Sequence, residues 1–93
     1  MSKLYSSIHI QKILEKLGFV FVSQKGSHGK FKKGNGLIVI LPMNKNEIPL
    51  GTFRSILRQA KIDLSVFKSF DWSQTIKKQI YFNFINLGFL FSK

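Results

Sequence analysis

Few residues of this chain can perform chemistry, and one of them lies in a strongly basic segment. His28 follows the turn-forming residues Gly26 and Ser27. Lys25 and Lys30 lie on either side of it. Imidazole gains and loses a proton near neutral pH, and lysine attracts phosphate, so the segment combines proton transfer with anion binding. We therefore expect it to attract a backbone phosphate.

These groups have the chemistry to cut an RNA backbone without a metal. A base takes the proton of the 2′-hydroxyl as that oxygen attacks phosphorus, an acid protonates the departing 5′-oxygen, and cations stabilise the charged transition state. His28 is the group expected to transfer protons. From the residues alone, a single histidine in a basic turn is more often an ordinary surface residue, so both interpretations stay open at this point.

The overall composition favours a polyanionic partner. The 93 residues include 15 Lys and Arg but only four Asp and Glu, which gives a formal net charge of +11. Nucleic acid, anionic lipid or an acidic protein would each fit such a charge. Cysteine is absent, which excludes disulfides and thiolate metal sites, and we expect neither a metal nor another cofactor.

The apolar segments are too short to predict a membrane span. The longest charge-free run, residues 79–92, is shorter than the roughly 17 to 25 residues of a spanning helix. Polar residues also interrupt the N-terminal apolar stretch, unlike a signal peptide. We therefore expect a cytoplasmic protein without a membrane partner.

Two amphipathic helices are expected to frame the basic segment. In residues 7–17, apolar side chains recur at the i, i+3, i+4 and i+7 positions that form one helical face. Ser6 or Ser7 is expected to cap the start of this helix. The same spacing in residues 53–60 predicts a second helix, with Thr52 as its N-cap.

Three strands are predicted between the helices. Residues 19–24, 29–33 and 37–41 are short runs suited to a pleated sheet, separated by turn signals at 25–27 and 34–36. The order is therefore α-β-β-β-α. It predicts an α+β sandwich, in which a three-stranded antiparallel sheet carries both helices on one face and leaves the other face open.

Two longer motifs resemble those of the HicA family of toxins. The first is Gln-Lys-Gly-Ser-His at residues 24–28, which follows a helix ending in Leu-Gly-Phe at residues 17–19. The second is Ile-Pro-Leu-Gly-Thr-Phe-Arg-Ser-Ile-Leu-Arg-Gln-Ala at residues 48–60. With both motifs in order, the resemblance covers about residues 5–67.

The resemblance implies a fold similar to that of double-stranded RNA-binding domains. It also implies the toxin of a type II toxin-antitoxin system, an endoribonuclease that cleaves mRNA independently of the ribosome and is inhibited by a HicB antitoxin. His28 would then be the catalytic residue. A non-catalytic module that binds double-stranded RNA is the main alternative, and a basic membrane-surface protein is a weaker one.

Further substrate contacts are expected around His28 and on the second helix. Lys25 and Lys30 supply charge, whereas Gly26 and Ser27 shape the turn. Two arginines one helical turn apart can hold phosphates, although an exposed helical face also needs charge. The expected substrate-binding residues are Lys25, Gly26, Ser27, Lys30, Arg54 and Arg58.

Two positions and the C-terminal segment depart from the family pattern. Many relatives have a second His or a bulky residue where this chain has Gly29, and a His where it has Met43. Residues 1–68 are expected to form the toxin-like domain and residues 69–93 an extension. The pattern from residue 72 onward fits a helix and a strand equally, and its many aromatic residues favour a core or an interface over base stacking. The oligomeric state is not predicted.

Overall fold

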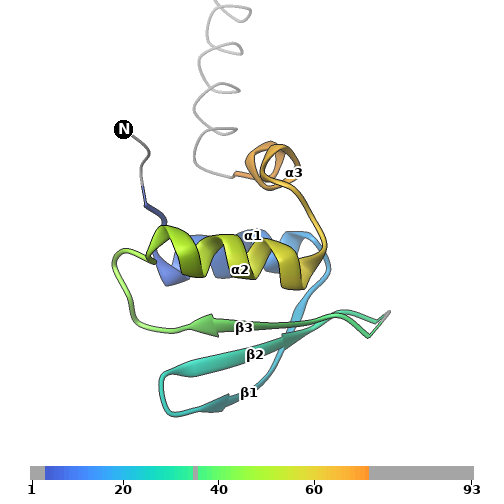
Figure 1. Cartoon of the computed structure of the whole chain (residues 1–93). Coiled ribbons are helices and arrows are strands. Elements are labelled where there is room, and N and C mark those ends of the chain that lie inside the picture. Colours follow the sequence, from blue (N-terminus) through green and yellow to red (C-terminus); the bar gives the residue numbers. More distant parts are fainter. Residues whose placement is uncertain (1–3, 35, 72–93) are drawn as a thin grey trace, which may run out of the picture.

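The predicted α+β architecture is confirmed. A computed structural model of the chain describes residues 4–34 and 36–71. A helix, three antiparallel strands in the order β1-β2-β3 and two further helices follow one another along the chain (Figure 1). The elements are α1 (Ser7–Lys16), β1 (Val20–Lys25), β2 (His28–Lys32), β3 (Ile38–Pro42), α2 (Leu50–Ala60) and α3 (Leu64–Ser69).

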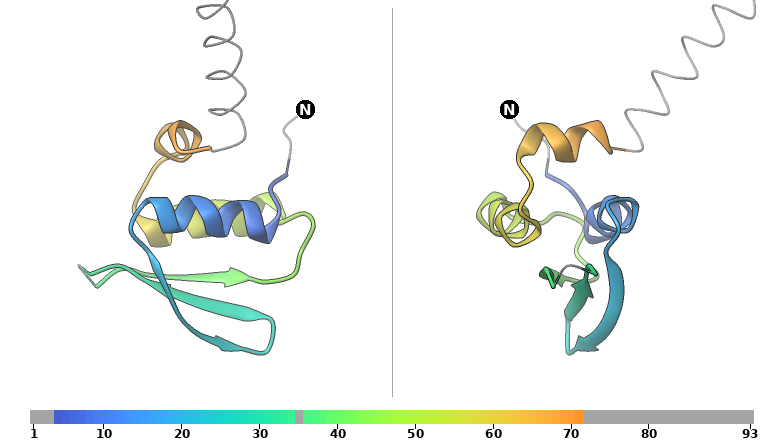
Figure 2. Two further views of the ribbon diagram at one scale, coloured as in Figure 1. Left: turned by 180° about the vertical axis from the view of Figure 1, so that it is seen from behind. Right: turned by 90° about the vertical axis from the view of Figure 1, so that its right-hand side faces the viewer.

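The elements form layers that leave one face of the sheet open. Helices α1 and α2 lie side by side on the same side of the sheet, nearest to β3 (Figures 1 and 2). Helix α3 lies across this pair, on the side away from the sheet. The face of the sheet that looks away from the helices is therefore free to carry a site.

The core lies between the sheet and the two long helices, as the apolar spacing predicts. Alternate residues of β2 and β3 point inward, because successive side chains of a strand face opposite sides. The stripes of α1 and α2 cover them. The largest fully buried apolar side chains are those of Phe31, Phe67, Ile10, Ile13, Leu14, Leu41, Ile48, Ile56 and Val39.

The two long helices begin in different ways. Ser6 caps α1, since its Oγ accepts a hydrogen bond from the amide of His9 at 3.1 Å. The expected N-cap at Thr52 is wrong, because α2 already begins at Leu50, after Pro49, and has no side-chain cap. Pro49 has a φ of −56°, and its carbonyl accepts the first helical hydrogen bond, from Phe53 at 2.9 Å. The helix therefore starts one turn earlier than the Thr52 signal suggests.

Helix α3 is joined to the core by aromatic packing. Phe67 is fully buried and lies against Phe53 and Tyr5, with ring centroids 4.8 and 5.0 Å apart. Asp63 caps the helix by accepting hydrogen bonds from the Val66 amide and the Ser65 hydroxyl. These contacts bring the residues just beyond the second motif into the same core.

The end of the described chain is fixed to α1 by a hydrogen bond between a buried carboxylate and a histidine. Asp71 is only 1% exposed, and its Oδ1 lies 2.8 Å from Nε2 of His9. The expected domain limit at residue 68 stays a prediction. The ambiguous segment 72–93 lies outside the described residues. Within residues 4–34 and 36–71, none of the helices has the length and apolar character that a membrane crossing requires.

Candidate functional site

The basic segment forms the hairpin turn between β1 and β2. Lys25 pairs with His28 across the two strands, so Gly26 and Ser27 are the two turn residues. Gly26 has a φ of +58° at the first turn position, which a two-residue hairpin of the II′ type requires and which glycine adopts without strain. The Gln24 side-chain amide also donates to the Gly26 carbonyl at 3.0 Å. The turn thus places His28 at the first position of β2.

The open face of the sheet is organised as three rows that cross all three strands. Directly paired residues of neighbouring strands lie on the same face. The rows, in the order β1, β2 and β3, are Lys25, His28 and Pro42; Ser23, Lys30 and Ile40; and Val20, Lys32 and Ile38. The middle strand therefore presents His28, Lys30 and Lys32 in one line.

A β-bulge in β1 decides which residues join these rows. The register shifts between Phe21 and Ser23, which leaves Val22 as an extra residue. Strict alternation would put Val20 and Ser23 on opposite faces, whereas the bulge puts both on the open face. Phe21 turns to the helix side, where its ring meets that of Phe31 edge-on at 5.6 Å.

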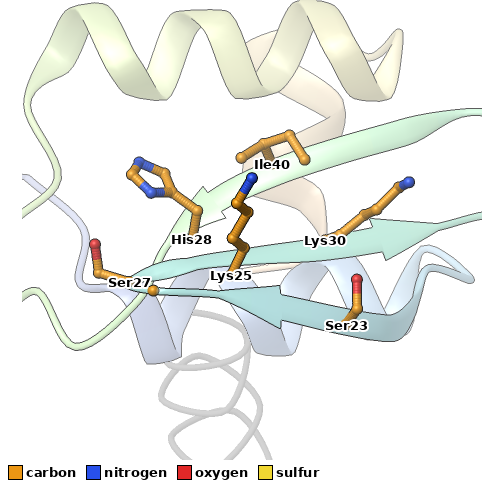
Figure 3. Close-up of a pocket in the computed structure, with 7 residues that line it drawn as sticks. Ser23, Lys25, Ser27, His28, Lys30 and Ile40 are labelled. Carbon is orange, nitrogen blue, oxygen red and sulfur yellow. The ribbon is translucent and has the colours of Figure 1, made fainter.

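The turn and most residues of the first two rows line an open depression of about 720 Å³. Figure 3 shows the side chains of Lys25, His28 and Lys30 projecting from β1 and β2 to the same side of the sheet. All three are exposed, and no carboxylate is among the described residues that line the depression. The other lining residues are Ser23, Gly26, Ser27 and Ile40. The site is therefore positively charged and open to a large substrate.

The turn is also anchored from the side of β3. The amide of Met43 donates to the Ser27 carbonyl at 2.6 Å. Pro42, which precedes Met43, accepts a hydrogen bond from the buried Ser7 hydroxyl, also at 2.6 Å. Ser7 Oγ in turn accepts from the Lys45 amide at 3.0 Å. Ser7, at the start of α1, thus fixes the segment from Pro42 to Lys45, and this segment fixes the turn through Met43. The spacing of residues in the sequence did not predict this role of Ser7.

The two positions that depart from the family pattern contact each other. A Cβ at Gly29 would lie 2.9 Å from Sδ of Met43, closer than side chains approach in proteins. It would also lie 3.3 Å from the Phe31 ring. Met43 therefore occupies the space that a side chain at residue 29 would need. Gly29 is the residue that follows His28 in the sequence.

Helix α2 is linked to β3, at the edge of the site, by the side chain of Gln59. Oε1 of Gln59 accepts the Ile40 amide at 2.7 Å, and its Nε2 donates to Ser55 Oγ at 3.2 Å. Ile40 is the β3 member of the Lys30 row. Because β3 is an edge strand, the Ile40 amide has no partner on a further strand of the sheet, and Gln59 satisfies it instead.

The structure gathers four of the six expected substrate-binding residues around His28. Lys25, Gly26, Ser27 and Lys30 line the depression, whereas Arg54 and Arg58 are exposed on α2 and do not. Lys33, near His28 in the sequence, instead lies over the Phe19 ring, with its Nζ 5.8 Å from the ring centroid. Within residues 4–34 and 36–71, no three His, Asp or Glu side chains come together as metal ligands do.

The comparisons with known proteins agree with the two motifs. The family model described as "HicA toxin of bacterial toxin-antitoxin" matches residues 9–62, which is more than half of the chain. This match includes the turn with His28, all three strands and α2. No curated protein matches the chain. The chain belongs to the HicA family of toxins of bacterial toxin-antitoxin systems.

Proposed function

We propose that this protein is an endoribonuclease that cleaves mRNA, with His28 as its catalytic residue. The observation that carries the proposal is that His28, Lys25 and Lys30 project to the same side of the sheet and line one depression of its open, positively charged face. A phosphodiester placed there would meet a proton-transfer group and two cations together. Membership of a toxin family gives such an activity a biological use.

The reaction proposed is attack by the 2′-hydroxyl on the neighbouring phosphorus. A bond forms between the 2′-oxygen and phosphorus, and the bond from phosphorus to the 5′-oxygen breaks. One proton leaves the 2′-hydroxyl and one reaches the 5′-oxygen, and imidazole is suited to such transfers. The ammonium groups of Lys25 and Lys30 stabilise the negative charge that develops on the phosphoryl oxygens. The products carry a 2′,3′-cyclic phosphate and a 5′-hydroxyl.

Substrates that lack one 2′-hydroxyl test this chemistry directly. The purified protein is incubated with a single-stranded RNA, and with the same RNA carrying a single 2′-deoxy nucleotide at the mapped cleavage position. We expect the all-RNA strand to be cut to the stated ends in the presence of EDTA, and the substituted strand to stay intact at that position. Cleavage after the 2′-deoxy nucleotide, or loss of activity with EDTA, would overturn the mechanism.

The same incubation separates the main alternative function. The order of helices and strands resembles that of double-stranded RNA-binding domains, which recognise duplex RNA by shape without cutting it. A binding module would shift intact duplex in a salt-dependent way and release no fragments. The proposed enzyme releases fragments.

Family membership also implies an antitoxin partner. We propose that the partner is a HicB-type antitoxin that covers the open, basic face. A protein with an acidic surface would match the charge of Lys25, Lys30 and Lys32. Co-expression with the neighbouring reading frame, followed by purification, tests whether the two proteins form a complex that no longer cuts RNA.

A further inference from the structure

We propose that the open face carries a second subsite, formed by Lys32 with Val20 and Ile38, for an RNA backbone that continues away from His28. The proposal rests on the proposed function and adds to it the path of the strand. The substrate it selects is single-stranded RNA long enough to reach from the first row to the third. The subsite lies outside the depression that contains His28.

The geometry of β2 supports a linear path. His28, Lys30 and Lys32 are alternate residues of one strand and are all exposed. Alternate residues of a strand are separated by about 6.6 Å, which is close to the repeat between successive phosphates of an extended nucleic-acid strand. A strand lying along β2 would therefore bring the reacting phosphate to His28, the next phosphate toward Lys30 and a third to Lys32. The flexible side chain of Lys30 then serves both the reacting phosphate and the one that follows it.

Apolar side chains lie beside Lys32 on both neighbouring strands. Val20 and Ile38 flank it on the two neighbouring strands and are 64% and 40% exposed. Together with Ile40, which is 38% exposed, they form an apolar border along the line of cations. Riboses and the faces of unstacked bases pack against such surfaces, whereas the bases of a duplex are paired and stacked inside it. The mixture of cations and aliphatic side chains therefore favours a single strand.

Binding of uncleavable RNA tests the subsite without using activity. The full chain and its Lys32→Ala variant are titrated with fluorescent 2′-O-methyl oligonucleotides of increasing length, from the dinucleotide upward. We expect the affinity of the unchanged protein to rise with length until the third phosphate is reached. Lys32→Ala should lose only that last gain, with binding of the longer strands weakened about three- to fivefold. Its salt slope should fall by about 0.7, the value for one phosphate contact on a single strand.

Two control variants make the result specific. Lys12→Ala removes the same charge from the exposed side of α1, so it should leave the length dependence unchanged. Lys32→Arg keeps the charge and should keep the gain. Equal weakening by Lys32→Ala at every length, an equal effect of Lys12→Ala, or equally good competition by duplex RNA would overturn the subsite. None of these results depends on whether His28 cuts RNA, so this proposal and the proposed function fail separately.

Discussion

His28 is positioned by main-chain contacts on both sides of the turn that precedes it. Lys25 pairs with it across the hairpin, and the Met43 amide holds the Ser27 carbonyl. An imidazole on a regular strand has few directions open to it, which favours a reproducible approach to a bound phosphate. The residues that hold the main chain near His28 should therefore affect catalysis as well as stability.

The Met43 side chain leaves no room for a side chain at residue 29. Gly29→Ala would bring its Cβ to 2.9 Å from Met43 Sδ, so the methionine or the strand must move. We expect a loss of about 1 kcal/mol in the free energy of unfolding and a lower kcat with little change in KM, because His28 is adjacent. Urea unfolding and cleavage kinetics measure the two effects.

A double variant identifies the cause of that loss. Met43→Ala removes the closest contact of a side chain at residue 29 and leaves the one with the Phe31 ring at 3.3 Å. Adding Gly29→Ala in this background should therefore cost less than it does in the unchanged protein. The interaction free energy of the two substitutions measures this difference. Equal costs in both backgrounds would show that Met43 is not what excludes a side chain at position 29.

Helix α3 depends on its N-cap, Asp63. The Ser65 hydroxyl, followed by the Val66 amide, holds the pKa of Asp63 below its usual value of 3.8. A carboxyl whose pKa is lower in the folded state stabilises the fold above its unfolded pKa, and this contribution disappears as the pH falls through the folded pKa. Asp63→Ala should therefore lower the urea midpoint at neutral pH, and its effect should shrink as the pH falls below about 4. An effect that stays the same at pH 7 and at pH 2 would contradict the role of the charged cap.

The hydrogen bond between His9 and Asp71 joins α1 to the segment that follows α3. The carboxylate of Asp71 is 2% exposed and lies 2.8 Å from His9 Nε2. Burial raises the pKa of Tyr5, and the negative charge of Asp71 raises it further because it opposes ionisation of the phenol. His9→Ala should lower the free energy of unfolding by about 2 kcal/mol, the range for a hydrogen bond to a charged group.

A matched substitution on the same helix is the control. Gln11 also makes a side-chain hydrogen bond, but to the exposed Glu15 at 3.2 Å. Gln11→Ala should therefore change the stability by only a few tenths of a kcal/mol. Similar losses of stability for His9→Ala and Gln11→Ala in urea unfolding would show that the bond from His9 to Asp71 stabilises the fold no more than an exposed hydrogen bond does.

For the whole molecule, the aromatic contacts of Phe67 make α3 part of one core with the helices below it. Phe67 is fully buried, and its ring packs against the rings of Tyr5 and Phe53. Phe67→Ala should cost about 3 to 5 kcal/mol in the free energy of unfolding, a large share of what a small domain has. Leu64→Ala, which truncates a 44% exposed side chain on the same helix, should cost far less. Equal thermal shifts for the two variants would contradict the inclusion of α3 in the core.

Features that repeat along the chain were predictable from the sequence. The stripes of α1 and α2 and the three short strands follow from apolar spacing, and the turn with His28 follows from its glycine. Contacts between residues that are distant in the chain were not predictable from the sequence. The pair of His9 with Asp71 and the bond from Ser7 to Pro42 join residues far apart in the chain, and spacing carries no signal for them. The bulge at Val22 was also missed, although it decides that Val20 shares a face with Lys32.

Removal of the His28 side chain tests its proposed catalytic role. His28→Ala is compared with the unchanged protein for cleavage of a single-stranded RNA, while thermal unfolding and binding of uncleavable RNA are followed in parallel. The side chain is exposed, so we expect the fold to be kept and the affinity to change little, while cleavage falls by about 100-fold or more. Cleavage at the original rate by a folded His28→Ala variant would contradict a catalytic role for His28.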